Sequence, residues 1–138
     1  MQKLSSVLLV DDDETTNYLN AHLLKGLGVT DQVLVAHNGQ EALALLARHC
    51  GSPAATCPAL VLLDLHMPVM GGLDFLAAYQ PQPPAQAICV VVLSSSVHVH
   101  DLERLRGLRH LAVLQKPLTR AKIDGLLQEH FQRHLATR

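Results

Sequence analysis

Short apolar runs alternate with longer amphipathic segments along this chain. Four runs of four to six residues are rich in Val and Leu, and a fifth, weaker run follows them. Runs this short, with no polar alternation, are typical of strands buried on both faces of a parallel sheet. We therefore predict strands at Val7–Val10, Val33–Ala36, Leu60–Leu63, Ile88–Leu93 and Leu111–Leu114.

The segments between these runs repeat apolar residues at helical spacing, which predicts five helices. Asn38, with Glu41 three residues later, is the candidate N-cap of the second helix, and Thr119 is the candidate N-cap of the fifth. The stripes are Leu19, Leu23, Leu24 and Leu27; Ala42, Leu45 and Leu46; Leu73, Leu76 and Ala77; Leu102 and Leu105; and Ile123, Leu126, Leu127 and Phe131.

Five strand–helix units in succession indicate an α/β fold with a doubly wound parallel sheet. Each parallel crossover needs a helix, and right-handed connections place helices on both faces. The Pro-containing segments 51–58 and 80–87 are expected to be connecting loops, and 138 residues fit one domain. Ligands of such sheets bind at the carboxyl ends of the strands, so the residues at those ends matter most.

Polar side chains follow four of the five predicted strands. Because the carboxyl ends of parallel strands lie along one edge of a sheet, we expect these side chains to converge. Any one of them alone could be a helix cap, a turn residue or a surface charge; the combination predicts a site. They are Asp11, Asp12 and Asp13 after the first strand, Asp64 after the third, Ser94 after the fourth and Lys116 after the fifth.

Such a group of side chains predicts phosphoryl chemistry. Two carboxylates ~4 Å apart repel by roughly 4 kcal/mol at an effective dielectric near 20, so the cluster needs a cation or a shared proton. Carboxylate oxygens are hard ligands, which favours Mg²⁺. Beside Mg²⁺, Lys116 and the Ser94 hydroxyl, Asp64 is a plausible nucleophile towards phosphorus.

Four segments at the strand ends form one combined pattern: VLLVDDD at 7–13, VLLDLHMP at 61–68 with the glycines at 71 and 72, VVVLSS at 90–95 and QKP at 115–117. These segments resemble the receiver domain of the two-component response regulators. The resemblance extends from about residue 4 to about residue 133 and implies a single receiver domain over 1–138, without an effector domain. It also implies a flavodoxin-like (βα)5 sheet with strand order 2-1-3-4-5.

The resemblance implies a role for each candidate residue. The phosphoryl donor would be a phosphohistidine on a sensor histidine kinase or a phosphotransfer protein, and Mg²⁺ would be the cofactor. The Lys116–Pro117 bond is often cis in this family. The implied roles are phosphoacceptor for Asp64, metal ligands for Asp11, Asp12, Asp64 and the backbone carbonyl of His66, and phosphoryl contacts for Ser94 and Lys116.

By the same resemblance the protein is a regulator, not an enzyme, that catalyses only its own phosphorylation and dephosphorylation. It would change a docking surface for a downstream protein target, with no nucleic-acid or membrane partner, as a monomer or weak homodimer. One position departs from the family: Val113 stands where an aromatic residue is usual, three residues before Lys116. The usual relay to the output face through that aromatic is therefore open to question here.

Charge and cysteine content refine this picture. Formal net charge is −1, but residues 1–100 carry three basic and eight acidic side chains and residues 101–138 carry eight basic and four acidic ones. The basic helix near 120–133 is a candidate docking face, or simply a solvated helix face.

No targeting or membrane-spanning segment is evident, which predicts a cytoplasmic location. A Cys50–Cys57 disulfide would be disfavoured there, and Cys89 should be a buried thiol.

Two other functions remain open. Residues 11–15 fit the Asp-x-Asp-x-Thr motif of haloacid dehalogenase-type phosphatases, although no acidic pair follows Lys116 and Asp64 would have no role. The second alternative is a degenerate receiver that acts as an unphosphorylated scaffold.

Overall fold

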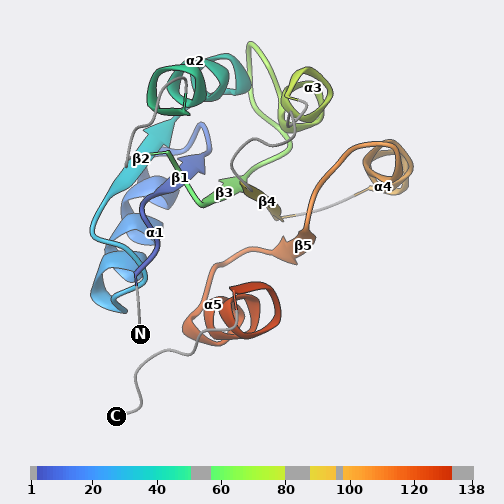
Figure 1. Ribbon diagram of the computed structural model, residues 1–138. Helices are drawn as coiled ribbons and strands as arrows, with labels where there is room; N and C mark the ends of the chain where they lie inside the picture. Colours follow the sequence, from blue (N-terminus) through green and yellow to red (C-terminus); the bar gives the residue numbers. More distant parts are fainter. Residues whose placement is uncertain (1–2, 51–56, 80–87, 96–97, 132–138) are drawn as a thin grey trace.

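A five-stranded parallel sheet forms the centre of the molecule, as the computed structural model shows for residues 3–50, 57–79, 88–95 and 98–131 (Figure 1). The strand order is β2-β1-β3-β4-β5, which confirms the predicted order. Register pairs such as Val10 with Leu63 align neighbouring strand ends. The strands are β1 (Val7–Val10), β2 (Val33–Ala36), β3 (Leu60–Leu63), β4 (Cys89–Ser94) and β5 (Ala112–Gln115).

The first three strands have the predicted bounds, whereas β4 and β5 each lie one residue further along the chain. The reason is that Ser94 and Gln115 pair with one another, so the ladder continues past the last apolar residue of each run. The polar ends of these two strands are therefore part of the sheet.

Helices cover both faces of the sheet, with α1 and α5 on one side and α2, α3 and α4 on the other (Figure 1). Both candidate caps are confirmed: the Asn38 Oδ1 accepts from the Glu41 amide at 2.8 Å, and the Thr119 Oγ1 accepts from the Lys122 amide at 3.2 Å. The helices are α1 (Glu14–Gly26), α2 (Gly39–Cys50), α3 (Gly72–Ala78), α4 (Val99–Arg106) and α5 (Arg120–Leu126), followed by the π-helical turn η1 (Leu127–Phe131).

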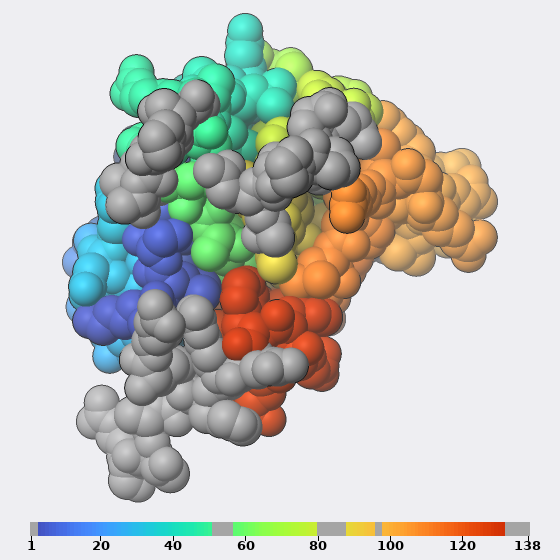
Figure 2. All heavy atoms as spheres, in the orientation of Figure 1, coloured from blue at the N-terminus to red at the C-terminus, as the bar shows by residue number. Residues whose placement is uncertain are grey.

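The core has two halves, because successive residues of a strand point to opposite faces of the sheet. Leu9 faces the half that includes Leu24 of α1 and Ile123 of α5, whereas Leu8 faces the half that includes Leu46 of α2 and Leu105 of α4. The space-filling view shows the α5 segment, in red, beside the N-terminal segment, in dark blue (Figure 2). Burial on both faces explains the uninterrupted apolar runs of the central strands β1, β3 and β4, whereas the edge strands β2 and β5 are partly exposed.

Two leucines of the predicted helical stripes lie outside the core. Leu19 is 57% exposed and Leu102 is 46% exposed, whereas α1 buries Asn17 and Leu24. A helix that covers one sheet face buries only a stripe of its surface, and both leucines fall beyond that stripe. Among the described residues, no helix is long and apolar enough to span a membrane.

The cysteine prediction is wrong in one respect: a disulfide joins Cys50 to Cys57. Cys50 is the last residue of α2 and Cys57 lies shortly before β3, and packing of these two elements places the two Cα atoms 4.7 Å apart. Cys89 is a free thiol, partly buried rather than fully buried, and burial raises its pKa. Residues 51–56 and 80–87 of the predicted loops lie outside the described residues.

Candidate functional site

The ends of β1 and β3 bring two acidic residues side by side. Val10 and Leu63 are register partners, so Asp11 and Asp64 follow at the same edge of the sheet. Main-chain hydrogen bonds continue past the strand ends: the Asp64 amide donates to the Val10 carbonyl at 2.9 Å, and the Asp11 amide donates to the Ala36 carbonyl at 3.0 Å. The sheet therefore fixes the backbone of both residues.

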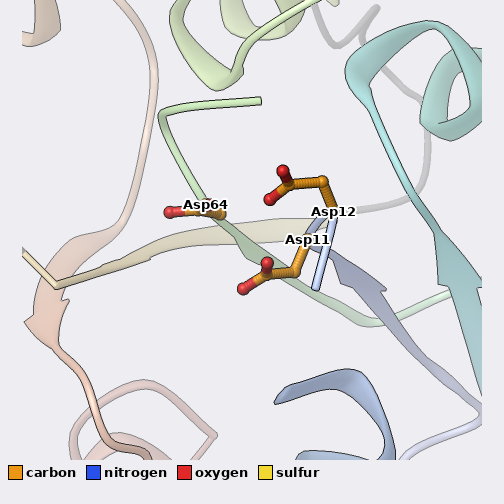
Figure 3. A group of neighbouring side chains, drawn as sticks. All are labelled: Asp11, Asp12 and Asp64. Carbon is orange, nitrogen blue, oxygen red and sulfur yellow. The ribbon is translucent and has the colours of Figure 1, made fainter. Parts of the chain in front are cut away.

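Asp11, Asp12 and Asp64 form one carboxylate cluster (Figure 3). One oxygen from each carboxylate lies within 4.8 Å of the others. Asp11 and Asp64 are buried, and Asp12 is exposed. Oxygen ligands gathered around one point, with an open side, suit a hard divalent cation that keeps some of its water.

Lys116, which directly follows β5, supplies positive charge to this cluster. Its Nζ lies 2.6 Å from Asp11 Oδ2 and 3.6 Å from Asp64 Oδ1. Burial alone would lower the pKa of Lys116, but the hydrogen bond to Asp11 and the charges of Asp64 and Asp11 outweigh burial and raise that pKa. Lys116 therefore stays an ammonium at neutral pH.

The Asp64 carboxyl group is in a different electrostatic position. Burial raises its pKa, the negative charge of Asp11 raises it further, and the ammonium of Lys116 opposes both effects. Its charge is thus incompletely compensated by the protein. A raised pKa marks a more basic carboxylate, and a perturbed carboxylate beside a lysine is a candidate nucleophile.

Ser94 reaches the same edge as the last residue of β4, where it is buried. Its carbonyl accepts a hydrogen bond from the Lys116 amide at 2.9 Å. The ends of β4 and β5 are thereby joined at the residues predicted to contact a phosphoryl group. The Lys116–Pro117 peptide bond is cis, as the family resemblance led us to expect.

Asp13 does not join the cluster, although it belongs to the same acidic run. It is the N-cap of α1, accepting from the Thr15 amide at 3.1 Å and from the Thr16 hydroxyl at 2.8 Å. These hydrogen bonds lower the pKa of Asp13. Of the three consecutive aspartates, therefore, two face the site and one begins the helix.

The His66 side chain contacts α4. Its Nε2 lies 3.2 Å from Asp101 Oδ2, and the same Asp101 oxygen accepts from the His98 amide at 3.2 Å. The predicted role of His66 uses only its backbone carbonyl, so the side chain is free to link this loop to the first turn of α4. Val113, the departure from the family pattern, is 37% exposed on β5.

Asn17 and Gly72 support the site; Gly72 belongs to a segment that the sequence singled out, whereas Asn17 has no recognisable signal in the sequence. The Asn17 Nδ2 donates to the Asp11 carbonyl at 2.8 Å, while its buried Oδ1 has no hydrogen-bond partner within the described ranges. Asn17 lines a small recess together with Asp11 and Asp64. A Cβ on Gly72 would overlap the Asp64 carbonyl oxygen, so α3 can begin this close to β3 only with glycine.

Comparison with known proteins places this geometry in a family. The model of the response regulator receiver domain matches residues 7–128. A two-component response regulator of Arabidopsis thaliana, ARR22, is 33% identical over 134 residues, which cover 94% of this chain and 86% of the relative.

Solved structures agree on the fold. A two-component response regulator from Cytophaga hutchinsonii superposes with a TM-score of 0.78 at 24% identity, covering 96% of this chain and 100% of that one. The complex of CheX, CheY, BeF₃ and Mg²⁺ from Borrelia burgdorferi gives a TM-score of 0.74 at 23% identity, covering 91% and 88%. With its sheet order, its acidic strand ends and a family match over most of its length, the chain belongs to the response regulator receiver domains of two-component signalling.

Proposed function

We propose that this receiver domain is a phosphoacceptor switch, in which Asp64 takes a phosphoryl group from a phosphohistidine of a sensor histidine kinase or phosphotransfer protein. The observation that carries the proposal is the position of Asp64: it is buried, its pKa is raised, and it lies within 4.8 Å of two further carboxylates. A structural acid would be expected to have its charge fully compensated.

In this proposal Asp64 attacks phosphorus through a carboxylate oxygen, and the bond from phosphorus to the donor nitrogen breaks. Lys116 lies 3.6 Å from Asp64 and can pair with a phosphoryl oxygen as negative charge develops. Ser94, at the adjoining end of β4, can donate its hydroxyl to a second phosphoryl oxygen. Charge stabilisation by positioned groups supplies most of the catalysis in such transfers.

Mg²⁺ is the cation we assign to the cluster, because its donors are carboxylate oxygens. Asp11, Asp12, Asp64 and the backbone carbonyl of His66 would hold it. When bound, the ion neutralises the carboxylates and the phosphoryl oxygens. The similar complex of CheX and CheY contains Mg²⁺ with BeF₃, which supports this pair as a probe.

We infer that the whole chain acts as one regulatory domain that catalyses only its own phosphorylation and dephosphorylation. Its output would be docking to a downstream protein target, or relay of the phosphoryl group. With Val113 in place of an aromatic residue, the contact between His66 and Asp101 offers another connection from the acceptor loop to α4.

Phosphorylation with acetyl phosphate and Mg²⁺ tests the proposal. Intact-mass measurement should show one added phosphoryl group on the wild type and none on Asp64→Asn. Asp31→Asn is the matched control, because Asp31 is an exposed partner of Lys3 and should leave labelling unchanged. Labelling of Asp64→Asn at the wild-type level would refute the assignment.

The two alternatives give different results in the same experiments. A scaffold would show no labelling, and Mg²⁺ with BeF₃ would leave the amide signals of Asp64 and Ser94 in place. A haloacid dehalogenase-type phosphatase would lose phosphoester turnover in Asp11→Asn but keep it in Asp64→Asn. Against this second alternative, Asp13, which would be the second aspartate of its motif, is the N-cap of α1.

A further inference from the structure

Lys122 contacts the chain on both sides of Lys116. Its Nζ donates to the Gln115 carbonyl at 2.5 Å and to the Pro117 carbonyl at 2.9 Å. Lys116 lies between these two carbonyls, and its own amide donates to the Ser94 carbonyl at 2.9 Å. The three hydrogen bonds together hold the backbone from which the Lys116 side chain reaches the carboxylates.

The position of Lys122 in α5 indicates that a lysine at this position does not serve to stabilise the helix. It is the third residue of α5, and Thr119 is the N-cap. A positive charge in the first turn opposes the helix dipole, and Glu or Gln is the favoured residue three positions after a Thr cap. Instead, the ammonium of Lys122 gains two carbonyl acceptors in the turn between β5 and α5.

Lys116 needs such support because it works at a distance from its own backbone. Its ammonium must stay 2.6 Å from Asp11 while remaining available to Asp64 at 3.6 Å. The strand that precedes it, β5, pairs with β4 alone among the described strands, so the sheet supports Lys116 from one side. A small shift of the turn would move the ammonium relative to both carboxylates.

We propose that Lys122 is a positioning residue for Lys116: it bridges the carbonyls of Gln115 and Pro117 and so fixes the ammonium at the carboxylate cluster. The inference rests on the proposed phosphoacceptor function and deepens it, because it assigns a role to a residue that does not touch the reacting atoms. Misplacement of a catalytic group by about 1 Å is enough to slow a positioned reaction.

The test compares the wild type with Lys122→Met, Lys122→Arg and Lys3→Met in the full chain. The initial rate of Asp64 labelling is measured with saturating Mg²⁺ and acetyl phosphate. We expect Lys122→Met to be roughly 3- to 10-fold slower, and Lys122→Arg, which keeps donors for both carbonyls, to recover most of the rate. Lys3→Met removes a lysine charge from the exposed pair with Asp31 and should label at the wild-type rate.

Hydrogen exchange of the Lys116 amide gives a second readout that does not need phosphorylation. It should be faster in Lys122→Met than in the wild type and in Lys3→Met. The proposal is overturned if Lys122→Met has the wild-type rate of Asp64 labelling and the wild-type exchange rate of the Lys116 amide. It is also overturned if Lys3→Met slows labelling as much as Lys122→Met does, because the slowing would then reflect the loss of a positive charge alone. If the wild type itself is not labelled, the phosphoacceptor function fails, and the exchange data still decide whether Lys122 holds the turn.

Discussion

Replacing Asp64 by asparagine removes one negative charge from the carboxylate cluster and keeps the size and shape of the side chain. In the protein without metal, Asp11, Asp12 and Asp64 have one oxygen each within 4.8 Å of the others, and the Lys116 ammonium lies beside Asp11 and Asp64. We therefore expect Asp64→Asn to be more stable than the wild type when Mg²⁺ is absent, although it loses the phosphoacceptor.

The magnitude follows from the distances. Like charges within 4.8 Å of one another repel by at least about 3.5 kcal/mol at an effective dielectric near 20, and this acts in full from buried Asp11 but only in part from exposed Asp12. The attraction of Lys116 at 3.6 Å is about 4.6 kcal/mol on the same scale. The repulsion and the attraction nearly cancel, so the lost hydration of Asp64 decides whether its charge stabilises or destabilises the fold. The net cost of that charge is on the order of 1–2 kcal/mol.

Thermal unfolding followed by circular dichroism measures the effect at pH 7, in low salt with a chelator. A gain of 1–2 kcal/mol should raise the Tm by about 3–8 °C in a domain of this size. Adding Mg²⁺ should raise the Tm of the wild type more than that of Asp64→Asn, because the variant has lost one ligand charge. Asp31→Asn, in an exposed pair with Lys3, should change the Tm little in either buffer.

The pH dependence has a definite sign. The pKa of Asp64 is raised above its ordinary value of 3.8, so its charge destabilises the folded state at neutral pH, and this cost disappears as the pH falls through the raised pKa. The Tm difference between variant and wild type should therefore narrow on acidification. A variant no more stable than the wild type in the chelator would refute the electrostatic reasoning.

Three further predictions follow from local features. Val69 has a φ of +69°, which costs a β-branched residue about 1–2 kcal/mol, so Val69→Asn should raise the Tm by a few degrees. Gly72→Ala would press a Cβ against the Asp64 carbonyl oxygen and should lower the free energy of unfolding by about 1–3 kcal/mol. Reduction of the Cys50–Cys57 disulfide opens a loop with a sequence separation of 7. It should lower the free energy of unfolding by about 2–3 kcal/mol, and therefore also the urea concentration at the midpoint of unfolding.

Each of these three predictions has a control or an outcome that would contradict it. Gly26→Ala adds a Cβ with nothing within 4 Å of it, so it should not lower stability as Gly72→Ala does. The disulfide prediction fails if dithiothreitol leaves the urea midpoint unchanged, or if a Cys57→Ser variant responds to it as the wild type does. An unchanged or lower Tm in Val69→Asn would mean that the loop already accommodates the left-handed residue.

Local pattern was sufficient for the elements of this fold. Short apolar runs marked three strands with their observed bounds, and side-chain caps located the starts of α2 and α5. The two strands placed one residue early, β4 and β5, end in Ser94 and Gln115, which join the sheet by pairing with each other. That pairing is a contact between distant segments, and hydrophobicity along the chain does not record it.

The candidate residues were also readable from the sequence, because they directly follow strands and match a specific family signature. Their division of labour was not. Asp11, Asp12 and Asp13 are chemically identical neighbours, and only the path of the chain into α1 makes Asp13 the helix cap. In the same way, only packing on the sheet explains why Leu24 is buried while Leu19 is 57% exposed.

The sequence by itself determined the order of strands and helices, the family and the chemical groups available at the strand ends, since each of these depends on short-range periodicity or on residue identity. The tertiary structure decided which groups meet: the ammonium of Lys116 and the carboxylate of Asp11, 105 residues apart in the chain, are 2.6 Å apart in space. The tertiary structure also brings Cys50 and Cys57 close enough for a disulfide, and it places the Lys122 ammonium in hydrogen-bond contact with the turn beside Lys116. The reason is that distances of this kind are set by the packing of the whole sheet and its helices, to which every part of the chain contributes.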